Sequence, residues 1–255
     1  MKVATWNVNG IRARAAQVRE LIARERPDIL CLQELKAGPA QVPEELTALD
    51  EYWGFWHGAR AYSGVALLVR RDQRPELPGF GHPSFDAETR IVTVDLAGDL
   101  PPVTVGSVYV PNGGKDFPAK LAFLQAMARY AAEAHAAGRR LILVGDLNVT
   151  RTDADVHEKE RDPRAIGQRP EERALLDAIL AAGLVDLGRA LDPDNDRLFT
   201  WWAPWRSHRQ KNIGWRLDYV LASEGLVRGA SRCVVLADHG TSDHAPVVAT
   251  LGDAA

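Results

Sequence analysis

The sequence predicts an α/β fold in which mixed β-sheets pack together and carry helices on their outer faces. Short apolar runs rich in β-branched residues have the length and composition of strands. These runs are Val3–Trp6, Ile29–Leu32, Val65–Val69, Ile91–Leu96, Val103–Val110, Leu141–Val144, Tyr219–Leu221, Val234–Leu236 and Val247–Leu251. No helical pattern separates the runs at 65–69, 91–96 and 103–110, so these are expected to pair antiparallel. That order excludes a purely parallel doubly wound sheet and favours packed mixed sheets.

Three segments between the strands have helical patterns. Ala15–Arg26 is amphipathic and stops before Pro27, a residue that disfavours helix in the position preceding it. Pro118–Ala137 and Pro170–Ala182 both open with proline, which suits the first turn of a helix, and both end before a glycine. The two acidic residues after Pro170 also suit a helix N-terminus.

The composition is that of one soluble globular domain covering residues 1–255. Hydrophobic residues make up 46 % and charged residues 25 %, and a chain of this length can bury a sizeable core. No repeat or Gly/Ser linker interrupts it, and the mixed charges of Arg151–Arg173 are typical of a solvated loop. Cys31 lies within an apolar run and is interpreted as a core residue.

Neither a signal-peptide stretch nor a membrane-spanning run is visible, so a reducing cytoplasm is the expected location. We expect a monomer, because no exposed apolar helix is apparent. The net charge of −3 argues against binding nucleic acid by bulk attraction, although a locally basic groove remains compatible with it.

Polar side chains follow the predicted strands where each strand ends. The segments are Trp6-Asn7, Gln33-Glu34, Tyr109-Val110-Pro111-Asn112, Gly145-Asp146-Leu147-Asn148 and Ser242-Asp243-His244. One such segment alone is typical of a turn. Their recurrence favours a site at the rim of a sheet, where α/β proteins bind ligands.

The oxygen donors at this rim predict a hard metal ion. Asn7, Glu34 and Asp243 offer amide and carboxylate oxygens, which suit Mg²⁺ or Mn²⁺ better than a structural zinc ion. A phosphate-binding P-loop is excluded around Lys115, because Tyr109 stands where that motif needs glycine and Asp116 where it needs Ser or Thr.

The segment Trp201–Arg216 combines tryptophan with basic residues and contains no Asp or Glu. It is interpreted as a nucleic-acid surface, in which cations contact phosphates and aromatic rings stack on or wedge between bases. The alternative is a Trp-rich edge of the core with solvated charges. The segment leads into Leu217 and Asp218, which adds a carboxylate before the next strand.

Together these motifs resemble exonuclease III, the abasic-site endonuclease family of the endonuclease/exonuclease/phosphatase (DNase I-like) superfamily. The resemblance runs from residue 1 to about residue 251 in order and spacing. It rests on WNVNGIRA at 6–13, LQELK at 32–36, YVPNG at 109–113, GDLNV at 145–149, GWRLDY at 214–219 and SDHAP at 242–246.

The resemblance implies a four-layered α/β sandwich of two mixed sheets flanked by helices. It also implies magnesium-dependent, or manganese-dependent, cleavage of double-stranded DNA 5′ to abasic sites and at blocked 3′ ends, using one or two ions. The implied metal ligands are Asn7, Glu34 and Asp243, with a possible second site at Asp146, Asn148 and His244. The implied catalytic residues are Tyr109, Asp146, Asn148, Asp218 and His244. The implied substrate-binding residues are Asn112, Lys115, Trp201, Trp205, Trp215 and Leu217.

The implied roles agree with the chemistry of phosphodiester hydrolysis. A cation and an imidazolium counter the negative charge that develops on the phosphoryl oxygens. A carboxylate such as Asp218 beside His244 would raise the pKa of the imidazole by favouring its charged form.

Three alternatives compete with this assignment. A superfamily phosphoesterase acting on inositol phosphates or sphingolipids would share the catalytic rim but would not need the basic, Trp-rich Trp201–Arg216. A 3′-end-processing exonuclease or phosphatase with weak abasic cleavage would differ only in loops. A catalytically dead binding module is expected to have lost at least one of Glu34, Asp146, Asp218 or His244, and all four are present.

Overall fold

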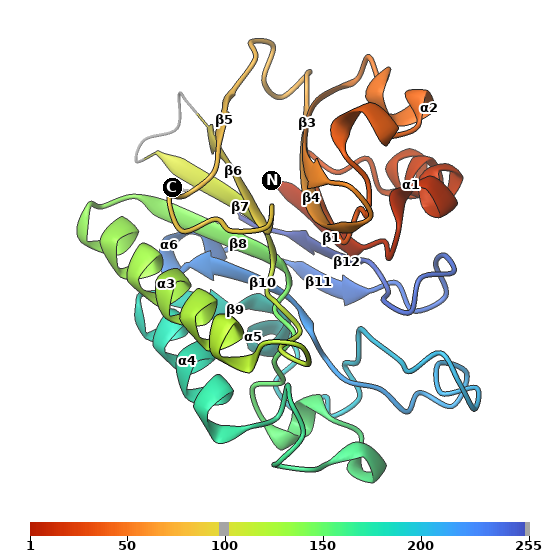
Figure 1. Cartoon of the computed structure of the whole chain (residues 1–255). Helices are drawn as coiled ribbons and strands as arrows, with labels where there is room; N and C mark the ends of the chain where they lie inside the picture. The colour runs from red at the N-terminus through yellow and green to blue at the C-terminus, as the bar shows by residue number, and fades with distance from the viewer. Residues whose placement is uncertain (97–101, 253–255) are drawn as a thin grey trace.

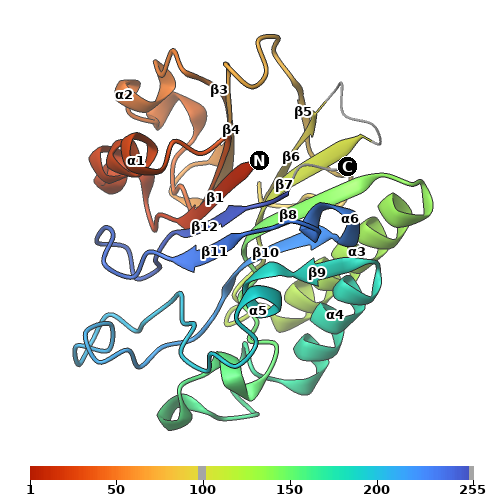
Figure 2. The ribbon, with the colours of Figure 1, turned by 180° about the vertical axis from the view of Figure 1, so that it is seen from behind.

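Two six-stranded sheets face each other in the computed structural model, which describes residues 1–96 and 102–252. Helices cover the outer face of each sheet, so the molecule has four layers (Figures 1 and 2). The four-layered α/β sandwich expected from the sequence is confirmed.

The first sheet contains both chain-terminal strands, β1 and β12. Its order is β11 (Arg232–Val235), β12 (Val247–Thr250), β1 (Lys2–Asn7), β2 (Ile29–Gln33), β4 (Tyr62–Arg70) and β3 (Tyr52–Ala59). Only β1 and β2 run parallel, joined by a helical crossover, and the other neighbours are antiparallel.

The second sheet repeats this mixed pattern. Its order is β5 (Gly79–Gly81), β6 (Ile91–Leu96), β7 (Val103–Tyr109), β8 (Arg140–Asp146), β10 (Asp218–Ser223) and β9 (Leu184–Asp186). Here β7 and β8 are the parallel pair, and a helix again connects them.

The helices are α1 (Ile11–Glu25) and α2 (Glu44–Thr47) beside the first sheet, α3 (Phe117–Ala136) and α4 (Pro170–Ala181) on the second, and the short α5 (Leu187–Leu191) and α6 (Glu224–Val227). Single 3₁₀ turns occur at Pro39–Gln41, Asp153–Asp155 and Glu158–Glu160. Asp116 caps α3 by accepting a 2.9 Å hydrogen bond from the backbone N–H of Ala119. Within the described residues, no helix has the length and apolarity needed to cross a membrane.

Three apolar layers hold the sandwich together, because successive side chains of a strand point to opposite faces. Val3, Ile142 and their inward-facing counterparts form the layer between the sheets. Trp6 and other outward residues pack under α1. Leu143 packs under α3 and α4 on the opposite side. Cys31 is fully buried between the sheets as a free thiol, as the sequence predicts.

The same alternation places polar residues at one end of the inter-sheet layer. In β8, Ile142 and Val144 point inward and Asp146 is the next residue on that face. In β1 the inward series from Val3 ends at Asn7. The site described below is therefore a continuation of the core, with polar side chains where the strands end.

The predicted strand segments all lie largely within observed strands, whereas one expected pairing is wrong. Val65–Val69 does not pair with Ile91–Leu96, because β4 pairs with β2 and β3 in the first sheet while β6 belongs to the second. The runs at 91–96 and 103–110 do pair antiparallel. Strands β3, β5 and β9 were not predicted, and α1 begins at Ile11 instead of Ala15.

Candidate active site

Four strands contribute polar side chains to one rim of the sandwich. β1, β7 and β8 end there with Asn7, Tyr109 and Asp146. β10 begins there, because it runs antiparallel to β8 with Asp218 directly opposite Asp146. His244 reaches the same place from the loop before β12.

Asp146 lies at the centre and is buried. Its Oδ2 accepts a 2.9 Å hydrogen bond from Asn7 Nδ2, and its Oδ1 accepts a 2.9 Å bond from the backbone N–H of Asn148. Burial and the carboxylate of Asp218 raise the pKa of Asp146 to about 7, against the lowering effect of His244 and the amide donors. A carboxylate with such a pKa can accept a proton near neutral pH.

His244 is held between two carboxylates. Its Nδ1 lies 2.8 Å from Asp218 Oδ2, and its Nε2 lies 3.8 Å from Asp146 Oδ2. Burial lowers the pKa of the imidazole, but Asp218 and Asp146 outweigh it and raise the pKa to about 10. The two carboxylates therefore favour the charged form of the imidazole. The contact with Asp218 is a hydrogen bond and that with Asp146 a longer ion pair, and the three side chains lie close enough together to be a candidate metal site.

Glu34 and Asp243 are joined through Lys36 and Asn9. Lys36 Nζ lies 2.8 Å from Glu34 Oε1 and donates to Asn9 Oδ1 at 2.6 Å. Asn9 Nδ2 then donates to Asp243 Oδ1 at 2.8 Å. Burial raises the pKa of Asp243, but His244 and the hydrogen bonds from Asn9 and Trp201 outweigh it, so the pKa is lowered and the carboxylate stays ionised.

The donor set at Asn7, Glu34 and Asp243 fits a hard divalent cation. Both acids belong to the ionic network at the rim, and the ammonium of Lys36 beside Glu34 shows that positive charge is accommodated there. The Glu34 side chain is partly exposed, so its carboxylate can be reached from solvent. Glu34 also has φ of 56°, a left-handed conformation that non-glycine residues adopt at a cost and that is common at functional sites.

Tyr109 lies close to both groups of carboxylates. Burial, Glu34 and Asp146 raise the pKa of its phenol well above the usual range, so the hydroxyl remains a hydrogen-bond donor. The guanidinium of Arg90 lies over the ring, 5.0 Å from its centroid. Arg90 was not singled out from the sequence, since only the pairing of β6 with β7 brings it to Tyr109.

Asn148 is held from two sides and has φ of 51°. Its Nδ2 donates to Val110 O at 3.0 Å and to Asp146 Oδ2 at 3.2 Å. Its Oδ1 accepts from Asn112 Nδ2 at 3.3 Å, which places the exposed Asn112 at the edge of the site.

Lys120 is a site-supporting residue that was missed from the sequence. Its side chain is fully buried, its Nζ donates to the backbone carbonyl of Asn148 at 2.7 Å, and it forms an ion pair with the buried Glu172. Glu172 in turn accepts a 2.8 Å hydrogen bond from Gly167 N. A signal was available, because Lys120 lies on the apolar stripe of α3 that continues through Leu124 and Met127.

Three of the predicted substrate-binding residues lie together next to His244. The rings of Trp201 and Trp215 meet edge to face, with centroids 5.6 Å apart. Trp201 lies beside His244, with 6.5 Å between ring centroids, and its Nε1 donates to Asp243 Oδ2 at 3.0 Å. Leu217, two residues after Trp215, is buried.

Gly167 borders these rings and was also missed. A Cβ atom at this position would lie 3.0 Å from Cζ3 of Trp215 and 3.3 Å from the carbonyl oxygen of Asn148, and φ is +95°. Both the close approach and the backbone conformation favour glycine here.

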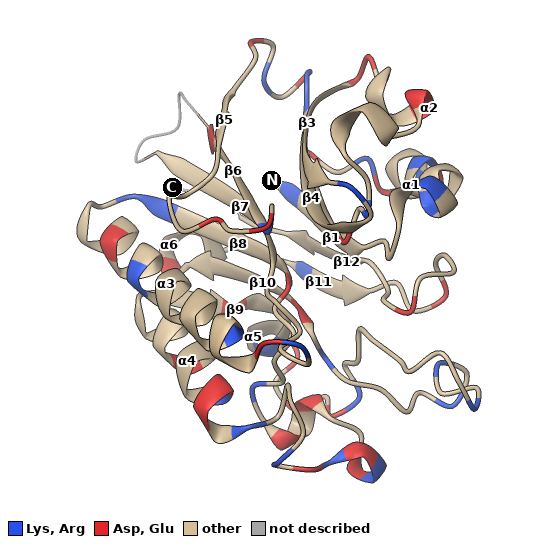
Figure 3. Cartoon of the chain, viewed as in Figure 1, with Lys and Arg blue, Asp and Glu red and all other residues tan. Residues whose placement is uncertain are grey.

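The other two predicted substrate-binding residues lie outside this group. Lys115 is exposed in the loop before α3. Trp205 is 59 % exposed within the long 200–214 segment, which carries basic but no acidic residues (Figure 3).

Each interpretation of Trp201–Arg216 accounts for part of the segment. Arg206 and Lys211 are exposed, as a nucleic-acid surface requires. Trp202 is buried in the core, and the buried Arg216 forms ion pairs with Asp155 and Asp186 at 2.8 and 2.7 Å. The Arg151–Arg173 loop thus contributes Asp155 to the interior and is only partly solvated.

The sequence matches the family model described as the endonuclease/exonuclease/phosphatase family over residues 4–244. It is 32 % identical to DNA repair nuclease APEX1 of Danio rerio, with 97 % of this chain and 81 % of the relative covered. It is also 32 % identical to exodeoxyribonuclease III of Haemophilus influenzae, with 97 % and 98 % covered.

Solved structures agree with these relatives. The 3′ phosphatase NExo from Neisseria, bound to a product DNA hairpin, superposes with a TM-score of 0.86 at 30 % identity, covering 99 % of this chain and 100 % of that one. An AP endonuclease from Archaeoglobus fulgidus gives 0.83 at 26 % identity, with 99 % and 100 % covered. The chain is thus a nuclease of the endonuclease/exonuclease/phosphatase family and belongs to its exonuclease III and abasic endonuclease group.

Proposed function

We propose that this nuclease repairs DNA by hydrolysing the phosphodiester bond 5′ to abasic sites in duplex DNA, and that it also processes 3′ ends. The observation that carries the proposal is the convergence of Asp146, His244 and Asp218 next to the paired rings of Trp201 and Trp215. The hydrolytic groups and two aromatic rings suited to contact a bare sugar then share one rim. Relatives named for DNA repair and for AP endonuclease activity support the substrate.

Asn7, Glu34 and Asp243 would hold the magnesium or manganese ion. When bound there, such a cation supplies positive charge that stabilises the developing charge on the phosphate. We propose one ion, because in the second candidate set of Asp146, Asn148 and His244 the Nδ1 of His244 is engaged by Asp218, and Asn7 and Asn148 already donate to Asp146 Oδ2.

The remaining steps belong to side chains of the chain itself. Asp146 orients a water molecule and accepts its proton, and Asn148 holds that water through its amide. His244, kept charged by Asp218, and the phenol of Tyr109 donate hydrogen bonds to the phosphoryl oxygens. Asn112 positions the neighbouring nucleotide, and Lys115 and Trp205 contact the duplex further from the scissile bond.

A pocket walled by the rings of Trp201 and Trp215 would favour a nucleotide without a base. An abasic nucleotide leaves the helix at a lower cost in stacking and pairing than an intact one. Trp201, Trp215 and Leu217 would enclose the bare sugar, and an attached base would collide with the rings. Gly167 lets the backbone pack closely against the ring of Trp215.

A 3′-end-processing enzyme with weak abasic cleavage is the second candidate, favoured by the similarity to the Neisseria 3′ phosphatase. The test compares cleavage of an abasic duplex, a 3′-phosphate duplex and an inositol phosphate, each with magnesium and with chelator. We expect abasic cleavage to be fastest and to require metal. Faster 3′-phosphate release would favour the second candidate, and hydrolysis of the inositol phosphate alone would contradict both.

The Asp146→Asn variant tests the assigned chemistry. It removes the proton acceptor but no phosphate contact, so turnover should fall by at least about a hundredfold while DNA affinity is retained. A fall in affinity that matches the fall in rate would contradict the role.

A further inference from the structure

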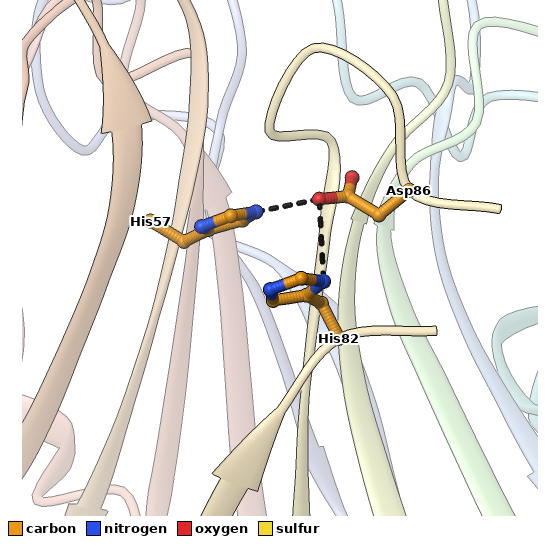
Figure 4. Close-up of side chains that lie close together, drawn as sticks. All are labelled: His57, His82 and Asp86. Atoms are coloured by element: carbon orange, nitrogen blue, oxygen red, sulfur yellow. Dashed lines mark hydrogen bonds and ion pairs between the residues drawn. The ribbon is translucent and has the colours of Figure 1, made fainter. Parts of the chain in front are cut away.

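His57, His82 and Asp86 form a second cluster of ligand-type side chains. His57 Nε2 lies 2.6 Å from Asp86 Oδ2, and His82 Nδ1 lies 3.9 Å from the same oxygen (Figure 4). One donor atom from each residue lies within 4.8 Å of the other two. The two imidazole rings stack with centroids 4.7 Å apart and an angle of 11° between their planes.

This cluster joins the edges of the two sheets. His57 comes from β3, the edge strand of the first sheet, and His82 directly follows β5, the edge strand of the second. Asp86 lies in the loop between β5 and β6. The three side chains therefore meet across the open side of the sandwich.

The cluster is separate from the candidate active site. Across the first sheet, His57 in β3 lies opposite Val65 in β4, which lies opposite Gln33 in β2. Gln33 in turn lies opposite Asn7 in β1, so His57 and Asn7 occupy the same level of the sheet. Three strand spacings of ~4.8 Å place it about 14 Å away along the sheet. None of the residues assigned to catalysis belongs to it.

The chemistry of the cluster favours a borderline transition metal. Two imidazole nitrogens and one carboxylate oxygen are a ligand set of three-residue zinc sites, in which water takes the fourth position. The side chain of His82 is 50 % exposed, which leaves a path for that water. Magnesium prefers oxygen donors and would not select this set.

The carboxylate of Asp86 is already held in the orientation that a ligand needs. Its Oδ1 accepts hydrogen bonds from the backbone N–H groups of Arg90 at 2.7 Å and Ile91 at 3.1 Å. Oδ2 is thereby directed at the two histidines. Hydrogen bonds of this kind fix metal-binding carboxylates in position.

Ligand atoms around tetrahedral zinc lie ~3.4 Å apart, given bonds of about 2.0–2.1 Å. The distances from Asp86 Oδ2 to His57 Nε2 (2.6 Å) and to His82 Nδ1 (3.9 Å) lie on either side of that value. His82, whose side chain is half exposed, would have to move inward. One dication bound to the two imidazoles and the carboxylate would use all three donors.

We propose that His57, His82 and Asp86 bind one Zn²⁺ ion that fastens the edges of the two sheets together. The loop that carries Asp86 continues directly into Arg90, whose guanidinium lies over Tyr109. Zinc at the edge would therefore hold in place the segment that flanks the phosphate-binding tyrosine. This site supplies no group to the hydrolysis itself.

The experiment measures zinc binding by equilibrium dialysis and the visible absorption of the Co²⁺-substituted protein. His82→Ala is the test variant, because its partly exposed side chain can be removed without opening the core. His135→Ala, at an exposed position of α3, is the matched control, and Glu34→Gln, which removes a proposed active-site ligand, reports binding at the active site. Thermal midpoints without metal confirm that each variant folds.

We expect one equivalent of zinc and tetrahedral-type Co²⁺ bands in the unaltered protein, His135→Ala and Glu34→Gln. In His82→Ala the affinity should fall by at least about tenfold, the bands should vanish, and zinc should no longer raise the thermal midpoint. Equal zinc affinity in His82→Ala, or loss of binding in Glu34→Gln, would overturn the site.

Discussion

Lys120 Nζ donates a 2.7 Å hydrogen bond to the backbone carbonyl of Asn148 from a fully buried side chain. The same ammonium is paired with Glu172, which accepts from the backbone of Gly167. One buried charge pair therefore supports both the strained Asn148 and the glycine that borders Trp215.

Lys120→Met should lower both stability and turnover. Removing one partner leaves the Glu172 charge buried and unpaired, which costs about 3–5 kcal/mol of unfolding free energy. The double variant Lys120→Met/Glu172→Leu should recover much of that stability, since no charge remains buried. Its turnover should stay low, because the Asn148 carbonyl still lacks its donor. Denaturant unfolding and steady-state rates measure the two effects, and recovery of both together would argue against a positioning role.

Asp218→Asn should shift the pH–rate profile to lower pH. The pKa values of about 7 for Asp146 and about 10 for His244 predict activity that rises as Asp146 loses its proton and falls as His244 loses its own. Asp218 raises both pKa values, so replacing its carboxylate with an amide should move both limbs of the profile to lower pH. Because Asp146 and His244 interact, the two limbs describe the pair and not each residue alone. The measurement is kcat/KM across pH, with the exposed Asp194→Asn as control. An unmoved alkaline limb would contradict the assignment of His244.

Most strands could be predicted because each is a short apolar run rich in β-branched residues. β3 was not predicted, because two glycines and a histidine interrupt the apolar residues of Tyr52–Ala59. β5 and β9 are too short to show a period. The assignment of β4 to one sheet and β6 to the other could not be predicted, because it depends on contacts between residues distant in the chain.

The residues of the candidate site also fall into those that local sequence predicts and those that depend on distant contacts. Asn7, Asp146 and His244 were found because polar residues follow apolar strands in recognisable motifs, and the structure brings these three together. Arg90 and Gly167 act through neighbours that only the folded chain supplies. No local pattern marks an arginine that will lie over Tyr109, or a glycine that will face Trp215.

Glu34→Gln should weaken metal binding and reduce cleavage by at least about a hundredfold, as expected for loss of a ligand. The amide retains the size of the side chain but removes the charge that attracts the cation. Half-maximal activity should then require more magnesium. Titration of rate against magnesium measures this, and Glu20→Gln on the exposed face of α1 serves as control. An unchanged magnesium dependence would contradict the assignment of Glu34.

Trp215→Ala should relax the choice between abasic and intact nucleotides. Without the ring, the pocket has room for a base, so cleavage of intact or base-modified nucleotides should rise relative to abasic ones. If Trp215 served only the core, its loss would cost about 3–5 kcal/mol and depress every activity together. The ratio of the two cleavage rates, measured alongside the thermal midpoint, distinguishes these outcomes. A lower midpoint with an unchanged ratio would exclude the pocket.

Asn7 belongs to one sheet and Asp146 to the other, yet 2.9 Å separates Nδ2 of the first from Oδ2 of the second. The side chains packed between the sheets, such as Val3 and Val144, therefore act as spacers that set the distance between a proposed metal ligand and the proposed proton acceptor. A bulkier residue there would push the sheets apart and break that hydrogen bond, even if the chain still folded. Sequence drift in this layer is thus limited by the reaction rate as well as by stability, and side-chain volume is the property that must be kept.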